Sequence, residues 1–235
     1  FCFFFVGSYL VFIGVVLWHR NMFIRDRLVC FDAGHPLAVG RGCHGFDRRA
    51  ALEAMTATAN SKRMPGIEAY KQLGYVPYDS DATAASNTLE YAYDDWAIYA
   101  AAKAAGETAA AEEFAKRALS YRNVYNPQTG FACPRYADGR FKEGMDPYQT
   151  YNEGFIEGNS WNFSFHVPHD VFGMMRMMGG EKVFRQRLDE LFSMDLPEKY
   201  YEDNEDITAD CLVGGYVHGN EPSHHIPYLL SLKHN

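Results

Sequence analysis

Two apolar patterns of helical period, separated by a single glycine, constrain the fold of this chain more than any other feature. Residues 87–105 and 107–121 both carry apolar side chains at spacings of three and four. These side chains are Leu89, Ala92, Tyr93, Trp96 and Ala100 in the first stretch, and Ala111, Phe114, Ala118 and Tyr121 in the second. Such spacing gives each helix one apolar face, and Gly106 suits the end of the first helix. The sequence therefore predicts an antiparallel helical hairpin.

Local signals predict where other helices begin and end. Asp47 can cap a helix that runs to about Ala59. A shorter helix is expected across residues 65–73, closed by Gly74. The order Asn87-Thr88-Leu89-Glu90 resembles a capping box, which predicts that the first helix of the hairpin starts there.

The second half of the chain continues this alternation of helices and polar loops. Helices are expected near residues 161–165, 168–178 and 181–193, and Pro222 suits the first position of a closing helix through residue 232. Asp138-Gly139, in the middle of residues 131–141, predicts a small β-hairpin. The fold class expected is mainly α: part of an α/α toroid, with its chemistry on the loops at one end.

Composition excludes some functions and leaves others open. The net charge is −8 and no Lys/Arg-rich run occurs, which argues against a nucleic-acid partner. The five cysteines are odd in number and never form CxxC, so no zinc or haem spacing is present. The aromatic share of 15% fits either a packed core or a sugar-binding cleft.

The first 42 residues differ in character from the rest. Residues 1–18 form an uncharged apolar run, close to the ~20 residues with which a helix spans a bilayer. Two interpretations stay open: a signal peptide or membrane anchor, or a mistranslated end that does not belong to the protein. The domain prediction is a segment of doubtful origin over residues 1–42 and an incomplete catalytic domain over residues 43–235.

A dense polar and aromatic cluster over residues 151–162 carries the first candidate site. Glu157 lies among aromatic and amide side chains, including Trp161. A partly desolvated carboxyl can act as an acid, and aromatic faces stack on sugar rings. Glu157 is therefore the first candidate for the general acid of glycoside hydrolysis. Two alternatives remain: Glu157 caps the helix near Trp161, or Glu153 is the acid.

A second cluster follows at residues 218–225. It contains four candidate binding residues, His218, Asn220, Glu221 and His224. Carboxylate and amide oxygens favour a hard cation such as calcium, whereas the ExxH spacing from Glu221 to His224 offers a transition-metal alternative. In the structural alternative, Glu221 is placed at a helix N-terminus, where the helix dipole favours a carboxylate.

Two further acidic motifs favour structural roles. Asp94 and Asp95 are adjacent on a helix and point about 100° apart, so we expect one to be buried and the other solvated. His169-Asp170 has no accompanying GxSxG nucleophile motif. Neither motif predicts a catalytic centre.

Several strings, in order, resemble glycoside hydrolase family 92. They are TLEYAYDDW (residues 88–96), NPQTGF (126–131), EGNSW (157–161), VPHD (167–170) and HGNEPSHH (218–225). The resemblance covers residues 45–232. It implies a calcium-dependent, exo-acting, inverting α-mannosidase whose catalytic (α/α)6 barrel follows an N-terminal β-sandwich, with this chain covering the middle of the barrel.

The resemblance also implies roles for individual residues. Glu157 would be the general acid, and His218, Asn220, Glu221 and His224 would line the pocket for a terminal mannose. Calcium would clamp sugar hydroxyls, with Glu221 and the amide at position 162 as its ligands. The family usually has glutamine where this chain has Asn162, which is one methylene shorter.

Other family motifs do not occur in these 235 residues. The GNDDxG motif, whose aspartates would supply the catalytic base, is absent, as are the WDxxR motif and sandwich-like sequence. The expected partner is a mannose-containing oligosaccharide or glycoprotein glycan, in the bacterial periplasm or outside the cell. Without the base we expect this chain alone to be inactive; the alternative is a non-catalytic mannose-binding or vestigial protein.

Overall fold

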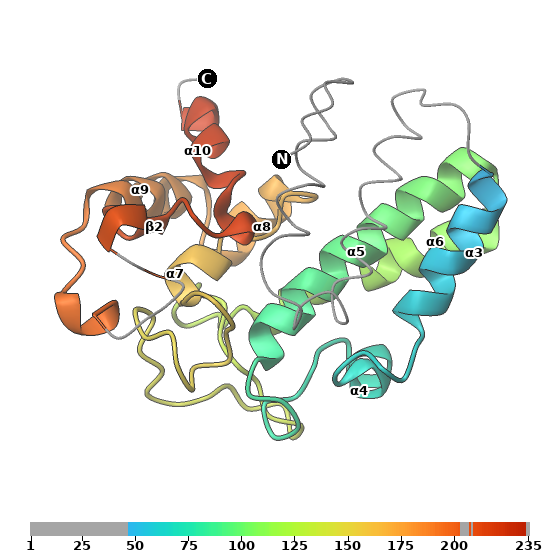
Figure 1. Cartoon of the computed structure of the whole chain (residues 1–235), viewed down its shortest axis with the longest axis horizontal. Coiled ribbons are helices and arrows are strands. Elements are labelled where there is room, and N and C mark those ends of the chain that lie inside the picture. Colours follow the sequence, from blue (N-terminus) through green and yellow to red (C-terminus); the bar gives the residue numbers. More distant parts are fainter. Residues whose placement is uncertain (1–46, 203–206, 208, 234–235) are drawn as a thin grey trace, which may run out of the picture.

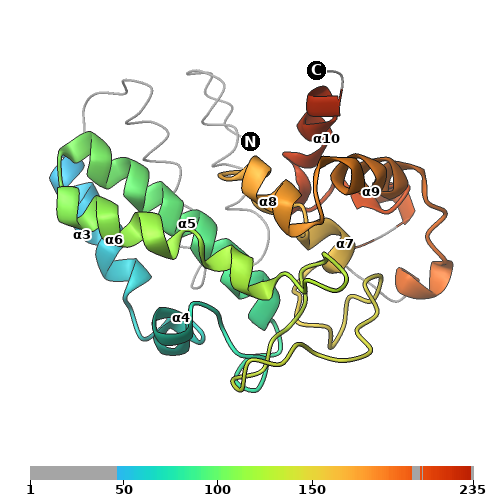
Figure 2. The same cartoon turned by 180° about the vertical axis from the view of Figure 1, so that it is seen from behind.

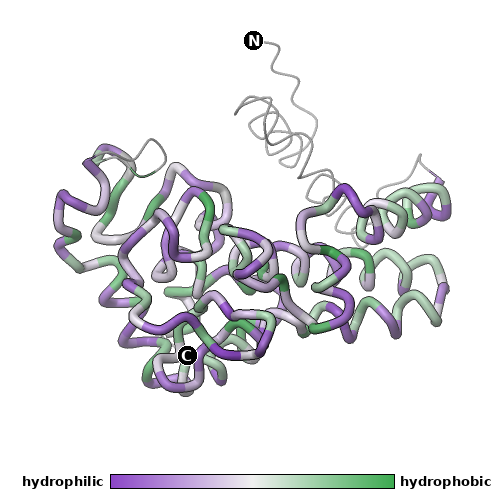
Figure 3. The backbone as a smooth tube through the Cα atoms, turned by 90° about the horizontal axis from the view of Figure 1, so that it is seen from below, coloured by the Kyte–Doolittle hydropathy of each residue, from purple (hydrophilic) through white to green (hydrophobic). Residues whose placement is uncertain are grey.

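A computed structural model describes residues 47–202, 207 and 209–233, of which Cys211, Glu221 and Lys233 are described in their backbone alone. The apolar segment over residues 1–42 lies outside the described residues. No described helix is long and apolar enough to cross a membrane. Hydrophobic and hydrophilic residues instead alternate along most of the helices (Figure 3).

The predicted helical hairpin is confirmed and forms one side of the molecule. Helices α5 (Ala84–Ala105) and α6 (Thr108–Arg117) run side by side with α3 (Arg48–Ala59) against them (Figures 1 and 2). Gly106 ends α5 in the left-handed conformation, with φ 78°. The three helices share a core of buried apolar side chains: Leu52, Met55, Ala59, Ile98, Ala101, Ala102 and Phe114.

Local capping signals at the first two helices are confirmed. The Asp47 carboxylate accepts hydrogen bonds from the backbone N–H groups of Arg49 and Ala50 at the start of α3. Helix α4 (Ile67–Leu73) lies between Gly66 and Gly74, which both have positive φ. A Cβ at Gly66 would lie 2.4 Å from Val76 Cγ1, so glycine is needed there for both conformation and space.

The predicted start of α5 is wrong. The helix begins at Ala84, and Asn87 and Glu90 lie inside it. No side chain caps its N-terminus; instead the carbonyl of Gly154 accepts hydrogen bonds from Ala85 N–H (3.0 Å) and Ser86 N–H (3.2 Å). The Asp81 carbonyl accepts from Ala84 N–H at 3.3 Å, but the acceptor for the next two N–H groups comes from a distant loop, so the local sequence marks this start only in part.

The other side of the molecule contains shorter elements around the largest apolar core (Figure 1). They are η1 (Ser120–Val124), α7 (Ser160–Phe163), α8 (Val171–Met177), α9 (Glu181–Ser193), η2 (Glu198–Tyr200), η3 (Ala209–Cys211), β1 (Leu212–Val213), β2 (Tyr216–Val217), η4 (Glu221–Ser223), α10 (Ile226–Leu229) and η5 (Leu230–Lys233). Between η1 and α7 the chain is irregular and loops below α7 and the first turns of α5 (Figures 1 and 2). This irregular stretch carries the candidate acid.

Two other predicted elements differ from the structure. The helix expected over residues 107–121 ends at Arg117, and η1 begins after it at Ser120. The hairpin expected over residues 131–141 is reduced to an isolated bridge between Arg135 and Phe141, and the only regular sheet among the described residues is the antiparallel pair β1–β2.

The closing helix does not begin at Pro222. Pro222 lies in the short η4, and α10 begins at Ile226 with Pro227 in its first turn. Pro222 and Pro227 each suit the first turn of a helix, so the segment forms two short helices, η4 and α10, in place of one long helix. Glu221 is therefore not at the N-terminus of a long helix, and the dipole interpretation of that residue is wrong.

The expectation that one of Asp94 and Asp95 is solvated is also wrong, because both are buried. Asp95 pairs with Arg117 at 2.8 Å and accepts a hydrogen bond from Tyr70 Oη at 2.7 Å. Arg117 also donates to Asn60 and to the carbonyl of Ala59. The cluster joins α3, α4, α5 and α6 and serves the fold.

Candidate active site

The loop that carries Glu157 has an unusual backbone. Asn152 and Glu157 are the two non-glycine residues with positive φ in the described part of the chain, at 59° and 55°. Asparagine tolerates this region, whereas glutamate does so at a cost on the order of 1–2 kcal/mol. Strain of this kind is held in place by surrounding structure and is concentrated at functional sites.

The surrounding structure fastens this loop, residues 152–157, at successive positions. The Asn152 carbonyl accepts hydrogen bonds from Tyr78 Oη and Lys142 Nζ, both at 2.7 Å. The Gly154 carbonyl caps α5, and the Phe155 ring is buried against Phe163. We call these six residues the acid loop.

The two candidate acids of the acid loop have different surroundings. Glu153 forms an ion pair with Lys142 in which both side chains are largely buried, so its carboxylate is committed to the loop. Glu157 is half-buried, and its backbone carbonyl accepts a hydrogen bond from Asn220 Nδ2.

The interpretation of Glu157 as a helix cap is wrong. Asn159 caps α7 by accepting a hydrogen bond from Asn162 N–H at 3.1 Å. Glu157 lies two residues before this cap, outside the helix.

Asn220 joins the two sequence clusters. It is 6% exposed, and its Nδ2 faces a carbonyl, which can only accept. The orientation of the amide is thereby fixed, and Oδ1 is left buried without a hydrogen-bond partner among the described residues. A buried acceptor of this kind fits a sugar hydroxyl or a hard cation.

Trp161 also offers one buried polar atom. The residue is 4% exposed, and its ring packs against Phe131 (centroids 4.8 Å apart) and Tyr148 (5.9 Å). The indole ring is therefore packed against other side chains and is not exposed for stacking on a sugar ring. Its indole N–H is buried without a partner in the described part of the chain and is the group it could offer to a ligand.

His218 and His224 lie together near the end of the described chain. Their ring centroids are 5.6 Å apart, and His224 Nε2 bonds to the carbonyl of His218 at 3.1 Å. His218 is exposed, with Nδ1 2.8 Å from Tyr216 Oη. The side chain of Glu221 lies outside what the structure describes.

Asn162 does not fit the role of metal ligand. Its Oδ1 accepts from Val217 N–H (3.2 Å) and from the Ser223 hydroxyl (3.4 Å), so both carbonyl lone pairs are used. Its Nδ2 donates to Asn159 Oδ1 and to the carbonyl of Gly215. The amide instead ties α7 to β2 and η4.

No group of three or more His, Cys, Asp or Glu side chains that could hold a metal gathers among the residues that the structure describes. Asn220 Oδ1 is one group there that fits a hard cation, because it is a buried amide oxygen without a hydrogen-bond partner among the described residues.

Glu90 and His166 form a contact that the sequence did not single out. His166 Nε2 lies 3.4 Å from a carboxylate oxygen of Glu90, and its Nδ1 lies 3.0 Å from the carbonyl of Pro222. This contact connects α5 to the segment that contains Asn220. No motif signal marked it, because its three members are far apart in sequence.

Two other histidines near this contact are neutral at pH 7. Burial lowers the pKa of His169 and of His225 to about 4. His169 Nε2 bonds to the carbonyl of Ala118, and Asp170 caps α8. The His169-Asp170 motif is therefore structural, as the sequence indicated.

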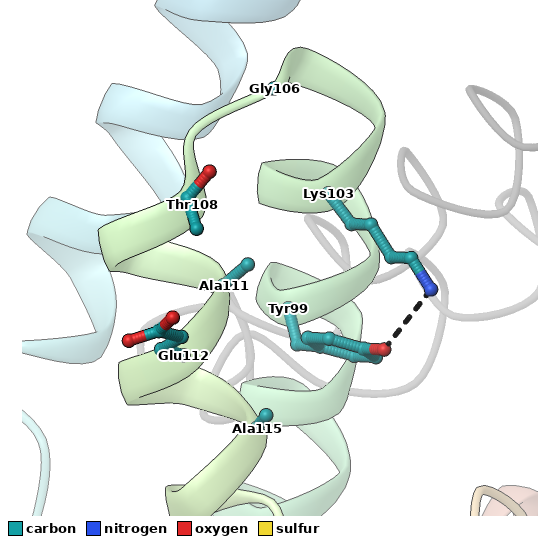
Figure 4. A pocket seen from close by; sticks show the side chains of 7 residues that line it. All are labelled: Tyr99, Lys103, Gly106, Thr108, Ala111, Glu112 and Ala115. Carbon is teal, nitrogen blue, oxygen red and sulfur yellow. Dashed lines mark hydrogen bonds between the residues drawn. The ribbon is translucent and has the colours of Figure 1, made fainter.

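A shallow groove between α5 and α6 lies away from these groups. It is lined by Tyr99, Lys103, Gly106, Thr108, Ala111, Glu112 and Ala115 (Figure 4). None of the candidate site residues contributes to it.

Comparison with known proteins agrees with the helical fold and the motifs. The model of the "Glycosyl hydrolase family 92 catalytic domain" matches residues 37–234. The fold and the site thus define a glycoside hydrolase catalytic domain. The chain belongs to glycosyl hydrolase family 92.

Solved structures of the family are similar to this chain. The family 92 α-mannosidase BT3965 from Bacteroides thetaiotaomicron is 35% identical, with a TM-score of 0.74 over 84% of this chain and 25% of that chain. The inverting mannosidase BT2199 from the same organism is 32% identical, with a TM-score of 0.72 over 84% of this chain and 28% of that chain.

A fungal relative extends the comparison. A protein described as an uncharacterised secreted glycosidase of Arthroderma benhamiae is 26% identical over an alignment of 162 residues, and the match covers 56% of this chain and 21% of the relative. The chain thus spans between about a fifth and just over a quarter of the length of these relatives.

Proposed function

We propose that this chain is part of a longer, full-length protein, that this full-length protein is an exo-acting α-mannosidase that removes terminal mannose with inversion, and that Glu157 is its general acid. The difference in surroundings between the two candidate acids, Glu157 and Glu153, carries the assignment. Glu157 is half-buried in a left-handed conformation, its carbonyl is bonded to Asn220, and it is no helix cap, whereas Glu153 is committed to Lys142. Similarity to solved family 92 mannosidases, one of them described as inverting, supports the same function.

The reaction needs two carboxyl groups. The Glu157 carboxylic acid would donate its proton to the leaving glycosidic oxygen. A second carboxylate, roughly 6.5–9.5 Å away, would activate water on the opposite face of the sugar. The family's GNDDxG motif does not occur in the 235 residues, so we propose that this chain alone does not turn over.

Binding of the terminal mannose is assigned to both clusters. Asn220 Oδ1 and the Trp161 indole N–H are buried groups without partners in the described structure, and His218 and His224, whose rings lie 5.6 Å apart, belong to the same segment as Glu221. Calcium, when bound, would supply positive charge to the sugar hydroxyls. Asn220 and Glu221 are proposed to hold it, and Asn162 is not, because its amide is fully bonded.

The proposed substrates are mannose-containing oligosaccharides and glycoprotein N-glycans. One solved α-mannosidase similar to this chain is described in complex with mannoimidazole, which supports recognition of a mannose ring. A periplasmic or secreted location is proposed, supported by the description of the fungal relative as secreted.

Glu157→Gln in the full-length protein tests the function. Glutamine keeps the size of the side chain but has no acidic proton to transfer, so we expect mannose release from α-mannobiose to fall by about 100-fold or more. Glu143→Gln is the matched control, because Glu143 is an exposed carboxylate outside the acid loop.

The anomeric form of the first product, followed by NMR, tests inversion: β-mannose is expected. Undiminished activity of Glu157→Gln would refute the assignment of the acid, and release of α-mannose would refute inversion.

A further inference from the structure

Lys142 is a largely buried lysine that no motif singled out. Its side chain is 18% exposed, and its backbone N–H is held by the carbonyl of Pro134 at 2.9 Å. Its ammonium lies 5.5 Å from the centre of the Tyr78 ring. A lysine at this depth is expected to have specific partners, because an unpaired buried charge is costly.

Both partners of Lys142 belong to the acid loop. Nζ donates to the carbonyl of Asn152 at 2.7 Å and to the carboxylate of Glu153 at 2.5 Å. Tyr78 Oη donates to the same Asn152 carbonyl. The carbonyl of a residue at positive φ thus receives two donors from separate segments, which holds that residue in its left-handed conformation.

The other contacts that hold the acid loop are made by successive residues towards Glu157. Gly154 is held by the N-terminus of α5, the Phe155 ring is buried in the core, and the carbonyl of Glu157 is held by Asn220. Lys142 therefore secures the first end of the acid loop, and Asn220 secures the second. Loss of Lys142 would leave Glu153 as an unpaired carboxylate with little exposed surface, which would move the first end towards solvent.

We propose that Lys142 is a positioning residue for Glu157: it holds the start of the acid loop so that the carboxyl group of Glu157 points at the glycosidic oxygen. This inference rests on the proposed role of Glu157 as general acid. Lys142 itself touches neither substrate nor the reacting atoms.

Leaving-group dependence distinguishes positioning of the acid from general support of the fold. A dinitrophenolate leaves without protonation, whereas the sugar leaving group of α-mannobiose needs the proton of Glu157. In the full-length protein, Lys142→Met is expected to lower kcat on α-mannobiose by about 10- to 100-fold, because small displacements of a reacting group are costly. On dinitrophenyl α-mannoside we expect less than about a threefold loss, since only proton donation is impaired.

Lys103→Met is the matched control. Lys103 also lies over a tyrosine ring, Tyr99, at 5.7 Å, but it is exposed on α5 and touches no residue of the acid loop in any contact described above. We expect both of its rates to equal those of the wild type. An equal loss of both rates in Lys142→Met, or no loss on α-mannobiose, would overturn the proposal. We compare the ratio of the two rates because this ratio does not depend on how much of the preparation is folded.

A second measurement separates this proposal from the proposed function. If the wild type releases mannose from neither substrate, the proposed function fails, and amide hydrogen exchange then decides the role of Lys142. The amides that report on the acid loop are those of Ala85 and Ser86, which donate to the Gly154 carbonyl. Faster exchange of these two amides in Lys142→Met, with unchanged exchange in α3 and α6, would support its hold on the acid loop, and unchanged exchange of these two amides would overturn it.

Discussion

Asn162 and Asn220 are both buried asparagines of the candidate site, but they use their amides differently. All four hydrogen-bonding positions of the Asn162 amide are occupied within the protein. Asn220 donates to the carbonyl of Glu157 and keeps its Oδ1 without a partner among the described residues. Asn162 therefore supports the fold, and Asn220 is able to serve both the acid loop and a ligand.

Substitution of each asparagine by aspartate separates these roles. Asn220→Asp loses the donor to Glu157 and sets a carboxylate against a carbonyl, so binding of methyl α-mannoside, measured by calorimetry with calcium present, should weaken at least about tenfold. Asn162→Asp loses two buried donors and should lower the free energy of unfolding by about 2–4 kcal/mol. The assignment fails if Asn220→Asp binds the sugar as tightly as the wild type.

The acid loop is the element on which the site depends, and Gly154 shows how closely it is packed. Gly154 has φ 86°, and a Cβ there would lie 2.3 Å from Pro134 Cγ. Gly106 has a similar φ, 78°, but no atom within 4 Å of the same position. The two glycines share a conformation and differ in the space around them.

Alanine at each glycine measures this difference. Gly106→Ala should cost about 1 kcal/mol, which is the cost of the left-handed conformation alone. Gly154→Ala should cost more, by about 1–3 kcal/mol for the overlap with Pro134, and should also weaken the capping of α5. Urea unfolding of both variants gives the comparison; equal losses would show that the acid loop can move away from Pro134 freely.

The elements that local chemistry determines were predictable, and those that distant groups determine were not. Asp47 at the start of α3 and the glycines around α4 are local signals, and both helices lie where these signals indicate. The start of α5 depends on the Gly154 carbonyl, 69 residues along the chain from Ala85.

The same distinction applies to the site. Glu157 could be selected from its neighbours in sequence, but the contact of Lys142 with the Asn152 carbonyl leaves no trace in a motif. Asn220 Oδ1 has no partner among the described residues, and this likewise follows from the hydrogen bond of Nδ2 to a distant carbonyl rather than from the sequence context.

At the scale of the whole molecule, buried histidines link stability to pH. His169 packs against Tyr93, Trp96 and Tyr121, and its Nδ1 has no hydrogen-bond partner in the described structure. A proton on Nδ1 would be buried without an acceptor, and burial lowers the pKa of His169 from 6.5 to about 4. The unfolded chain therefore binds this proton more readily than the folded chain.

The sign of the pH effect follows from this difference. The contribution of neutral His169 to stability is fully present above pH 6.5 and is lost as the pH falls towards 4, by up to about 3 kcal/mol. His169→Gln can still donate to the Ala118 carbonyl but does not titrate, so its unfolding free energy should fall less between pH 7 and pH 5 than that of the wild type. Parallel pH profiles of the two proteins would contradict the assignment.

The hydrogen bonds that hold the acid loop join parts of the chain that are far apart in sequence. The separation is 74 residues from Tyr78 to Asn152 and 63 residues from Glu157 to Asn220. Contacts of such long range close only after the intervening chain is ordered, whereas α5 and α6 need only a one-glycine turn to meet. We therefore expect the geometry around Glu157 to be assembled late in folding and to be the first to open in mild denaturant. Sugar binding should disappear while the helical hairpin is still intact, so a well-formed circular dichroism spectrum of this chain would report on its helices and not on its active site.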